Sequence, residues 1–216
     1  MVSNEEISVN KRNGRGKESL QIDKIHAMVG FATEGITGVS ASHVEMNSGI
    51  QLFDGISTAD IQQILIKSAN DLITLENPNY QYVAARLLLF SLRKQLFHRL
   101  WDHPKLIDHI KKLIDMGLYD KDILVNYDES EIDRMDMWID HERDYNFTYA
   151  GLRQVMDKYL VQDRSTGDIF ETPQFMYMMI SATLFAQYPK DKRMSYVKKY
   201  YDCLLYTSPS PRDDGV

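Results

Sequence analysis

Residues 7–26, ISVNKRNGRGKESLQIDKIH, place a strong turn between two short extended segments and then a helix start. Apolar and polar residues alternate over Ile7–Val9, and Asn13 and Gly14 form a dipeptide typical of hairpin turns. The return strand is expected at 19–22, and Asp23 is a suitable N-cap for the helix that follows. This stretch therefore predicts a β-hairpin that leads directly into a helix.

The rest of the chain shows helical periodicity almost throughout. Apolar residues recur at helical spacing, and Ser, Thr, Asp or Pro residues precede many of these runs. The expected helices span residues 23–35, 40–50, 58–72, 78–97, 106–116, 128–139, 149–160, 174–188 and 190–201. A second, short hairpin is expected around 159–170, and the segment 101–104 is expected to separate two units. The fold class is therefore predicted as mainly α, with an N-terminal β-hairpin capped by a small helical bundle, followed by a helical domain with a short hairpin.

The composition excludes several classes of protein. The chain has 216 residues, 44% hydrophobic and 26% charged, which is typical of a globular protein. No apolar run approaches the ~20 residues that a membrane span needs, and the N-terminus lacks the apolar core of a secretory signal. The net charge of −6 argues against non-specific nucleic-acid binding. Cys203 is the only cysteine, which excludes an intramolecular disulfide and a Cys-rich zinc site and favours a cytoplasmic location.

Cationic side chains gather in the N-terminal hairpin of this acidic protein. They are Lys11, Arg12, Arg15, Lys17 and Lys24, and the fourth expected helix adds Arg93 and Lys94 near its end. Ammonium and guanidinium groups suit phosphate oxygens, and the helix starts at Asp23 and Thr58 would add N–H donors. The spacing by itself favours a solvated basic hairpin instead, because no Walker loop or Gly-rich dinucleotide fingerprint is present.

Other groups of polar residues give weaker indications. His98, His103 and His109, with Asp102 and Asp108 nearby, match no common metal-site spacing and are expected to be surface histidines. The segment 140–144, DHERD, could supply an acid and a base, but ion pairing and helix capping are the favoured interpretation. The Met and aromatic run at 175–179 is expected to pack in the core.

Several long motifs occur in a fixed order along the chain. In the first half they are VNKRNG (9–14), IDKIH (22–26), GISTADIQQILIKSANDLI (55–73) and NPNYQYVAARLLLFSLRK (77–94). In the second half they are LIDHIKKLIDMGLYD (106–120), the stretch 135–185 and YVKKYYD (196–202). Together they resemble the N-terminal ATP-cone and the following helical region of the large, catalytic subunit of class I ribonucleotide reductase, in its bacterial aerobic form. The resemblance covers residues 7 to 202.

The resemblance implies a domain order and a function. It implies an ATP-cone at 1–100, a helical region at 101–202, and a catalytic α/β barrel that is missing from this chain. The family reduces ribonucleoside diphosphates to deoxyribonucleotides for DNA synthesis, as a homodimer of large subunits with a small subunit that holds a metal-tyrosyl radical. Thioredoxin or glutaredoxin supplies the electrons. The radical cysteine and the reducing pair lie in or after the barrel, so this chain alone is expected to be inactive.

In the family, the cone is the overall activity switch, which ATP turns on and dATP turns off, each with Mg²⁺. An alternative is a stand-alone ATP-cone regulator, with the helical half as an interaction domain. A third interpretation, a structural helical protein with solvated hairpin cations, also stays open. Neither a nucleic acid nor a membrane is an expected partner.

The resemblance also assigns roles to residues of the cone. Lys11 and Arg12 match the pair that contacts phosphate, and the segment 18–24 matches the one that surrounds the base and reaches the phosphates. The implied set is Lys11, Arg12, Lys24, Thr58 and Lys94 at the phosphates or ribose, Glu18 at the adenine amino group, Ile25 and Met28 as walls, with Gln21 and Gln62 nearby. Two departures are present: the hairpin loop is one residue longer, and Gln62 stands where the bacterial pattern has a histidine.

The last residues differ from the rest of the chain. The string CLLYTSPSPRD, which begins at Cys203, resembles translated sequencing adapter, so residues 203–216 are expected to be non-native. A flexible Pro/Ser tail is the alternative.

Overall fold

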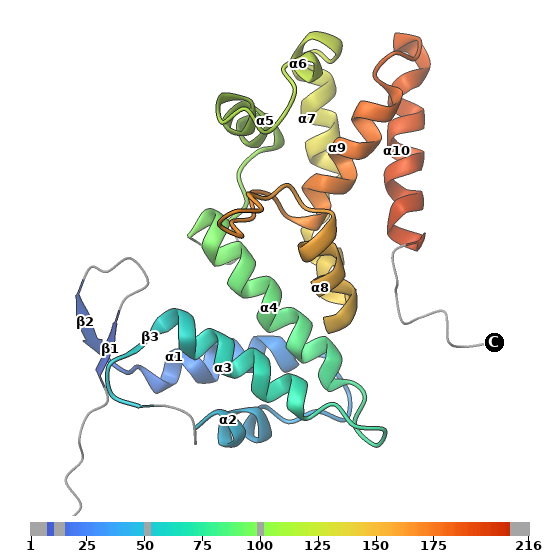
Figure 1. Cartoon of the computed structure of the whole chain (residues 1–216). Helices are drawn as coiled ribbons and strands as arrows, with labels where there is room; N and C mark the ends of the chain where they lie inside the picture. The colour runs from blue at the N-terminus through green and yellow to red at the C-terminus, as the bar shows by residue number, and fades with distance from the viewer. Residues whose placement is uncertain (1–7, 11–15, 50–52, 99–101, 208–216) are drawn as a thin grey trace, which may run out of the picture. The chain divides into compact units, whose positions relative to one another are not determined.

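The computed structural model describes residues 8–10, 16–49, 53–98 and 102–207. Among them it places a small sheet near the start of the chain and then helices, which confirms the predicted mainly α fold class (Figure 1). Two compact units are present: Met1–Ser91 with Thr148–Ala150, and Leu92–Phe147 with Gly151–Val216. The division falls inside one helix, Tyr80–Phe97, which therefore belongs to both units. The domain limits inferred at residues 100 and 202 stay predictions.

The first unit contains a three-stranded sheet with the order β2-β1-β3. Strands β1 (Ser8–Asn10) and β2 (Lys17–Ser19) are antiparallel, and β3 (Ile56–Ser57) lies parallel to β1. The hairpin is thus confirmed, but its return strand runs over 17–19 and not 19–22. The turn at 13–14 lies outside the described residues. The apolar side chains of Val9 and Ile56 are paired in register and buried, so they anchor the sheet on the helices below.

Helices α1 (Ile22–Thr33) and α2 (Ala41–Gly49) follow β2, and helices α3 (Thr58–Asp71) and α4 (Tyr80–Phe97) follow β3. Their buried faces carry the expected apolar residues, for example Val29, Val44 and Leu65. The N-cap of α1 is Gln21, so the cap expected at Asp23 is wrong: that carboxylate lies inside the first turn, where it still suits the helix dipole. Either Ser57 or Thr58 could cap α3 by residue type, and the structure uses Ser57, whose hydroxyl accepts a hydrogen bond from the Asp60 N–H at 3.0 Å.

The second unit is built from short helices. They are α5 (Leu106–Asp115), α6 (Asp122–Asn126), α7 (Glu129–Trp138), the 3₁₀ helix η1 (His141–Asn146), α8 (Tyr149–Lys158), α9 (Pro173–Phe185) and α10 (Lys190–Thr207). Helix α10 packs on α9 and α7, and α5 packs on α7. A full capping box at Asp128 and Glu131 starts α7, and Gly117, with φ of 70°, follows the end of α5.

Three features of this unit differ from the sequence prediction. Helices α6 and η1 are too short for a period to be visible, and neither was expected. Helix α10 continues to Thr207 and so runs into the segment expected to break the pattern. The second hairpin is confirmed as one antiparallel bridge between Gln162 and Ile169. None of the described helices is long and apolar enough to cross a bilayer.

A buried charge cluster joins the C-terminal half of α4 to η1. Arg93 is 1% exposed, and its guanidinium donates to the Tyr145 hydroxyl at 2.9 Å and to the His141 carbonyl. The nitrogen that donates to His141 also lies 3.6 Å from the Asp144 carboxylate, which accepts a further bond of 2.8 Å from Gln174. Arg93 therefore belongs neither to a phosphate-binding patch nor to the solvated basic surface that its spacing favours, because its charge is directed inward.

Histidines surround the same region. His103 and His141 stack with their ring centroids 3.7 Å apart, and His109 stacks on Phe175 at 4.3 Å. His109 is only 2% exposed, so the expected surface position is wrong for it. One apolar face of α5 points inward, and His109 occupies that face beside Ile110 and Leu113. No group of three His, Cys, Asp or Glu side chains in the described part of the chain could hold a metal ion.

Acidification is expected to destabilise the second unit. Burial, and then nearby positive charge, lowers the pKa of His109 to about 4 and that of His141 to about 2, from 6.5. Burial raises the pKa of Asp144 to about 6, from 3.8. Between pH 6 and 4 the unfolded chain therefore holds two extra histidine protons, and the folded chain holds one extra carboxyl proton. The unfolding free energy should thus fall by about 1.4 kcal/mol per pH unit in this window.

Urea unfolding of the chain at pH 6, 5 and 4 measures this slope. The histidine contribution is fully present above pH 6.5 and is lost as the pH falls. His109→Gln removes one of the two histidine terms and should leave a nearly flat profile over the same range. A stability that rises on acidification would contradict the neutral state of these buried rings.

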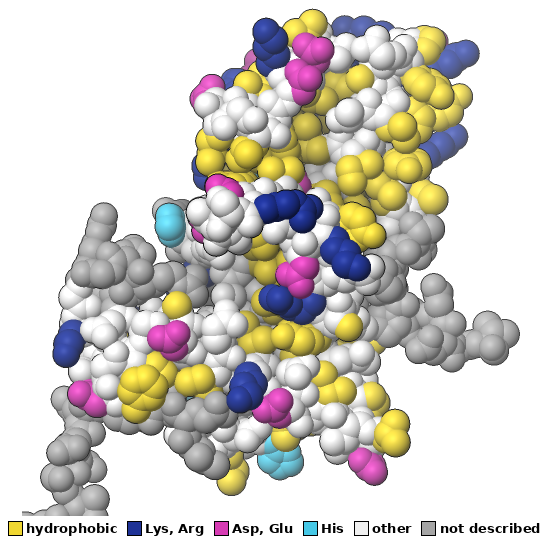
Figure 2. Space-filling model, viewed as in Figure 1, with side chains coloured by type: hydrophobic (Ala, Val, Ile, Leu, Met, Phe, Trp, Pro, Cys, Tyr) yellow, Lys and Arg dark blue, Asp and Glu magenta, His cyan; other side chains and the backbone are white. Residues whose placement is uncertain are grey.

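Exposed apolar side chains gather on α9 and α10 (Figure 2). Ile180, Leu184, Tyr188 and Tyr196 are all at least 41% exposed. The ring of Phe185 contacts Tyr188 and Tyr196, which links the two helices through an aromatic cluster. The N-terminal part of α9 is buried instead, and it includes the run 175–179, as the sequence predicted.

Candidate functional site

One edge of the small sheet collects three chain segments. Because β1 and β3 are parallel, their carboxyl ends lie at the same edge, where Asn10 pairs with Ser57. Because β2 is antiparallel to β1, its first residue, Lys17, lies at this edge as well and pairs with Asn10. The edge therefore brings together the end of β1, the start of β2 and the start of α3.

The loop before β3 is fastened to β1 by side chains. The Asp54 carboxylate accepts hydrogen bonds from the Ser8 N–H at 2.8 Å and from the Ser8 hydroxyl at 2.7 Å. These bonds lower the pKa of Asp54. The Asn10 amide donates to the Gly55 carbonyl at 2.6 Å, and Gly55 has φ of 80°, which favours glycine. This arrangement fixes the position of the α3 N-terminus against the strand.

The residues expected at the base lie in β2 and at the start of α1. Glu18 pairs with Val9, so its side chain lies on the same face of the sheet as the buried valine, and Glu18 is half-buried. Gln21 and Lys24 are exposed at the N-terminus of α1. Local chain order thus brings a carboxylate, an amide and an ammonium group into one region.

The apolar walls and the α3 residues have different environments. Ile25 is 9% exposed and Met28 is half-buried, so both face toward the core of the first unit. Thr58 is half-buried in the first turn of α3. Gln62 is 2% exposed, and its amide donates to the Leu87 carbonyl at 3.1 Å, so this nitrogen already serves the contact between α3 and α4.

Three residues of the implied set are not brought to this edge by the described contacts. Lys11 and Arg12 lie outside the described residues. Lys94 is half-buried in the last turn of α4 and belongs to the second unit. Their roles at the nucleotide stay predictions. The parallel strand β3 was not predicted from the sequence, because a strand of two residues shows no periodicity. The only signal was a glycine, Gly55, followed directly by the apolar residue Ile56.

Comparison with known proteins decides the family. Residues 7–95 match the ATP cone domain, and residues 145–210 match the all-alpha domain of ribonucleotide reductase. Over 216 residues and 99% of its length, the chain is 48% identical to the ribonucleoside-diphosphate reductase subunit alpha of Haemophilus influenzae. The chain belongs to the family of ribonucleoside-diphosphate reductase alpha subunits.

Other reductase alpha subunits give the same result. The chain is 45% identical to a ribonucleoside-diphosphate reductase 1 subunit alpha of Escherichia coli, over 99% of this chain. It is 41% identical to the alpha subunit of Enterobacteria phage T4, over 92% of this chain. The chain spans 28% of the length of the first two relatives and 26% of the third. The ATP cone match covers the sheet, helices α1 to α3 and α4 as far as residue 95, and the all-alpha match covers η1 from Tyr145 onward and helices α8 to α10. The origin of residues 203–216 stays a prediction.

Proposed function

We propose that the first unit binds an adenine nucleotide at the sheet edge where β1 ends and α3 begins. The parallel register of Asn10 and Ser57 supports this most directly, because it brings the strand that leads into Lys11 and Arg12 beside the N-terminus of α3. A helix N-terminus together with cationic side chains favours phosphate. The Thr58 hydroxyl suits a phosphate or ribose oxygen, and Lys24 and Lys94 are the further phosphate cations of the proposal.

Adenine recognition is assigned to Glu18. Its carboxylate would accept from the exocyclic amino group, and guanine carries an acceptor at that position, so a carboxylate there selects against it. Its half-buried place beside Val9 supports this role, because partial burial strengthens a hydrogen bond. Ile25 and Met28 would wall the base, with Gln21 at its edge. The bond from Gln62 to the Leu87 carbonyl leaves its carbonyl oxygen and its second amide hydrogen for a nucleotide.

The nucleotide would act as an allosteric effector of a reductase. In this proposal ATP, bound with Mg²⁺, raises and dATP lowers the activity of a full-length alpha subunit that reduces ribonucleoside diphosphates. That subunit would act as a homodimer with a radical-bearing small subunit and with thioredoxin or glutaredoxin as reductant. Its reducing cysteine pair would lie outside these residues, since Cys203 alone cannot form one. The match to the all-alpha domain counts against a stand-alone cone regulator.

Calorimetric titration with magnesium complexes of ATP, dATP and GTP tests the site. ATP and dATP are expected to bind the chain, and GTP much more weakly. Lys11→Ala, Lys24→Ala and Lys94→Ala should each weaken ATP binding by about 1.5–3 kcal/mol, because each removes a charge-assisted hydrogen bond. Glu18→Ala should instead reduce the difference between the affinity for ATP and the affinity for GTP.

A matched control is Lys67→Ala, which removes an exposed lysine in the middle of α3. It should leave ATP binding unchanged. Equal affinity for ATP and GTP that Glu18→Ala does not alter would contradict a specific site and indicate only a diffuse basic patch. Loss of ATP binding in the Lys67→Ala variant would indicate the same.

A further inference from the structure

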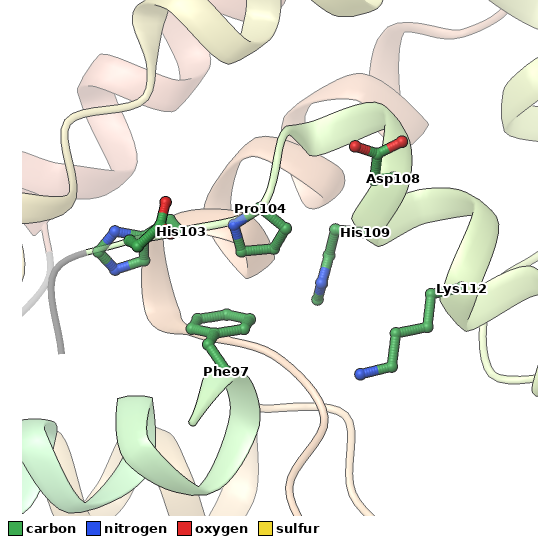
Figure 3. A pocket seen from close by; sticks show the side chains of 7 residues that line it. Phe97, His103, Pro104, Asp108, His109 and Lys112 are labelled. Atoms are coloured by element: carbon green, nitrogen blue, oxygen red, sulfur yellow. The ribbon is translucent and has the colours of Figure 1, made fainter. Parts of the chain in front are cut away.

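A cavity of about 390 Å³ opens in the second unit. Its walls include the ring of Phe97, the ring of Pro104 and the imidazoles of His103 and His109, and Lys112 lies at its border (Figure 3). A volume of this size is in the range of sites for small organic ligands. Most of the lining is therefore planar or apolar, with one ammonium group.

His109 points into this cavity from α5 (Figure 3). Its ring is held by stacking on Phe175 at 4.3 Å and by an edge contact with Tyr119 at 6.0 Å. Its Nε2 atom is buried and has no hydrogen-bond partner among the residues that the structure describes. A buried polar atom without a partner costs free energy that a bound ligand could recover.

Lys112 lies one turn after Asp108 on α5, at the spacing where an ion pair is usual. Within the described part of the chain, however, its ammonium forms no ion pair. Figure 3 shows the ammonium directed toward the space below His109, and the Asp108 carboxylate directed the other way. Burial lowers the pKa of His109, and the positive charge of Lys112 lowers it further.

We propose that this cavity binds a small planar carboxylate. The flat part would lie against Phe97 and Pro104, and the carboxylate would lie between the Lys112 ammonium and the His109 ring. A dianionic phosphate fits less well, because Lys112 is the only cation among the lining residues, and Asp102 and Asp108 are also among them. A metal ion fits less well for the reason given above, since the described residues offer no group of three ligands.

Titration of the full chain with benzoate tests this site. Benzoate should bind with a saturable isotherm, and benzamide, which has the same shape without the charge, should bind at least about tenfold more weakly. Lys112→Met should weaken benzoate binding by a similar factor. The matched control is Lys111→Met, which removes the neighbouring exposed lysine that does not line the cavity, and it should change the affinity less than about twofold.

Two controls test whether benzoate binds at the proposed nucleotide site instead of in this cavity. Saturating ATP with magnesium should leave benzoate affinity unchanged, and Glu18→Ala should have no effect on it. Absence of saturable benzoate binding would overturn the proposal. So would equal binding of benzoate and benzamide, equal losses in the two lysine variants, or competition between benzoate and ATP.

Discussion

Arg93→Ala is expected to lower the unfolding free energy of the second unit by about 3–5 kcal/mol. Arg93 is 1% exposed and Asp144 is equally buried, so the truncation leaves a carboxylate in the interior without its cation. Burial already raises the pKa of Asp144, and the guanidinium acts against this rise. The variant also removes the donor that the Tyr145 hydroxyl and the His141 carbonyl now share.

Urea unfolding, followed by circular dichroism and tryptophan fluorescence, measures this loss. The matched control is Arg153→Ala, because Arg153 pairs with Asp157 at 3.2 Å on the surface of α8. An exposed pair of this kind contributes about 0.3–0.5 kcal/mol. The double variant Arg93→Met/Asp144→Leu should recover part of the loss, since no unpaired charge remains. Similar losses for Arg93→Ala and Arg153→Ala would show that the buried cluster contributes no more than a surface pair.

Phe175→Ala is expected to cost about 3–5 kcal/mol in the same assay. Phe175 is fully buried, and its ring contacts Phe97, His109 and His141. Truncation removes the surface on which His109 stacks and leaves a cavity among three aromatic neighbours. Because the neighbouring rings belong to different elements, they cannot all move in to fill the space.

Leu184→Ala is the control within the same helix. Leu184 is 54% exposed near the end of α9, and its truncation should change the unfolding free energy by about 0.5 kcal/mol or less. If Phe175→Ala cost no more than this control, the core of the second unit could not be centred on the aromatic cluster around α9.

Local chemistry allowed most helices to be predicted from the sequence. The helices expected at 106–116 and 128–139 are present as Leu106–Asp115 and Glu129–Trp138, with Gly117 after the first and a capping box at Asp128 and Glu131 before the second. These features act between residues a few positions apart, so the sequence contains both partners. The motifs at 9–94 and 106–202 also gave the family, which the comparisons confirm.

Predictions failed where the partner is distant in the sequence. Arg93 and Lys94 look alike in the sequence, but Arg93 meets groups about 50 positions away in η1. His109 was expected at the surface, and its burial depends on Phe175 of α9.

The nucleotide site divides in the same way. The residue types at Glu18, Lys24 and Thr58 were visible in the sequence, because short motifs carry them. The position of the α3 N-terminus beside the end of β1 depends on β3, a strand of two residues that pairs with β1 across more than 45 positions. The sequence by itself thus determined most of the helices and the family. Only the tertiary structure decided which charges are buried and which segments share an edge, because these depend on packing between segments that local propensity does not encode.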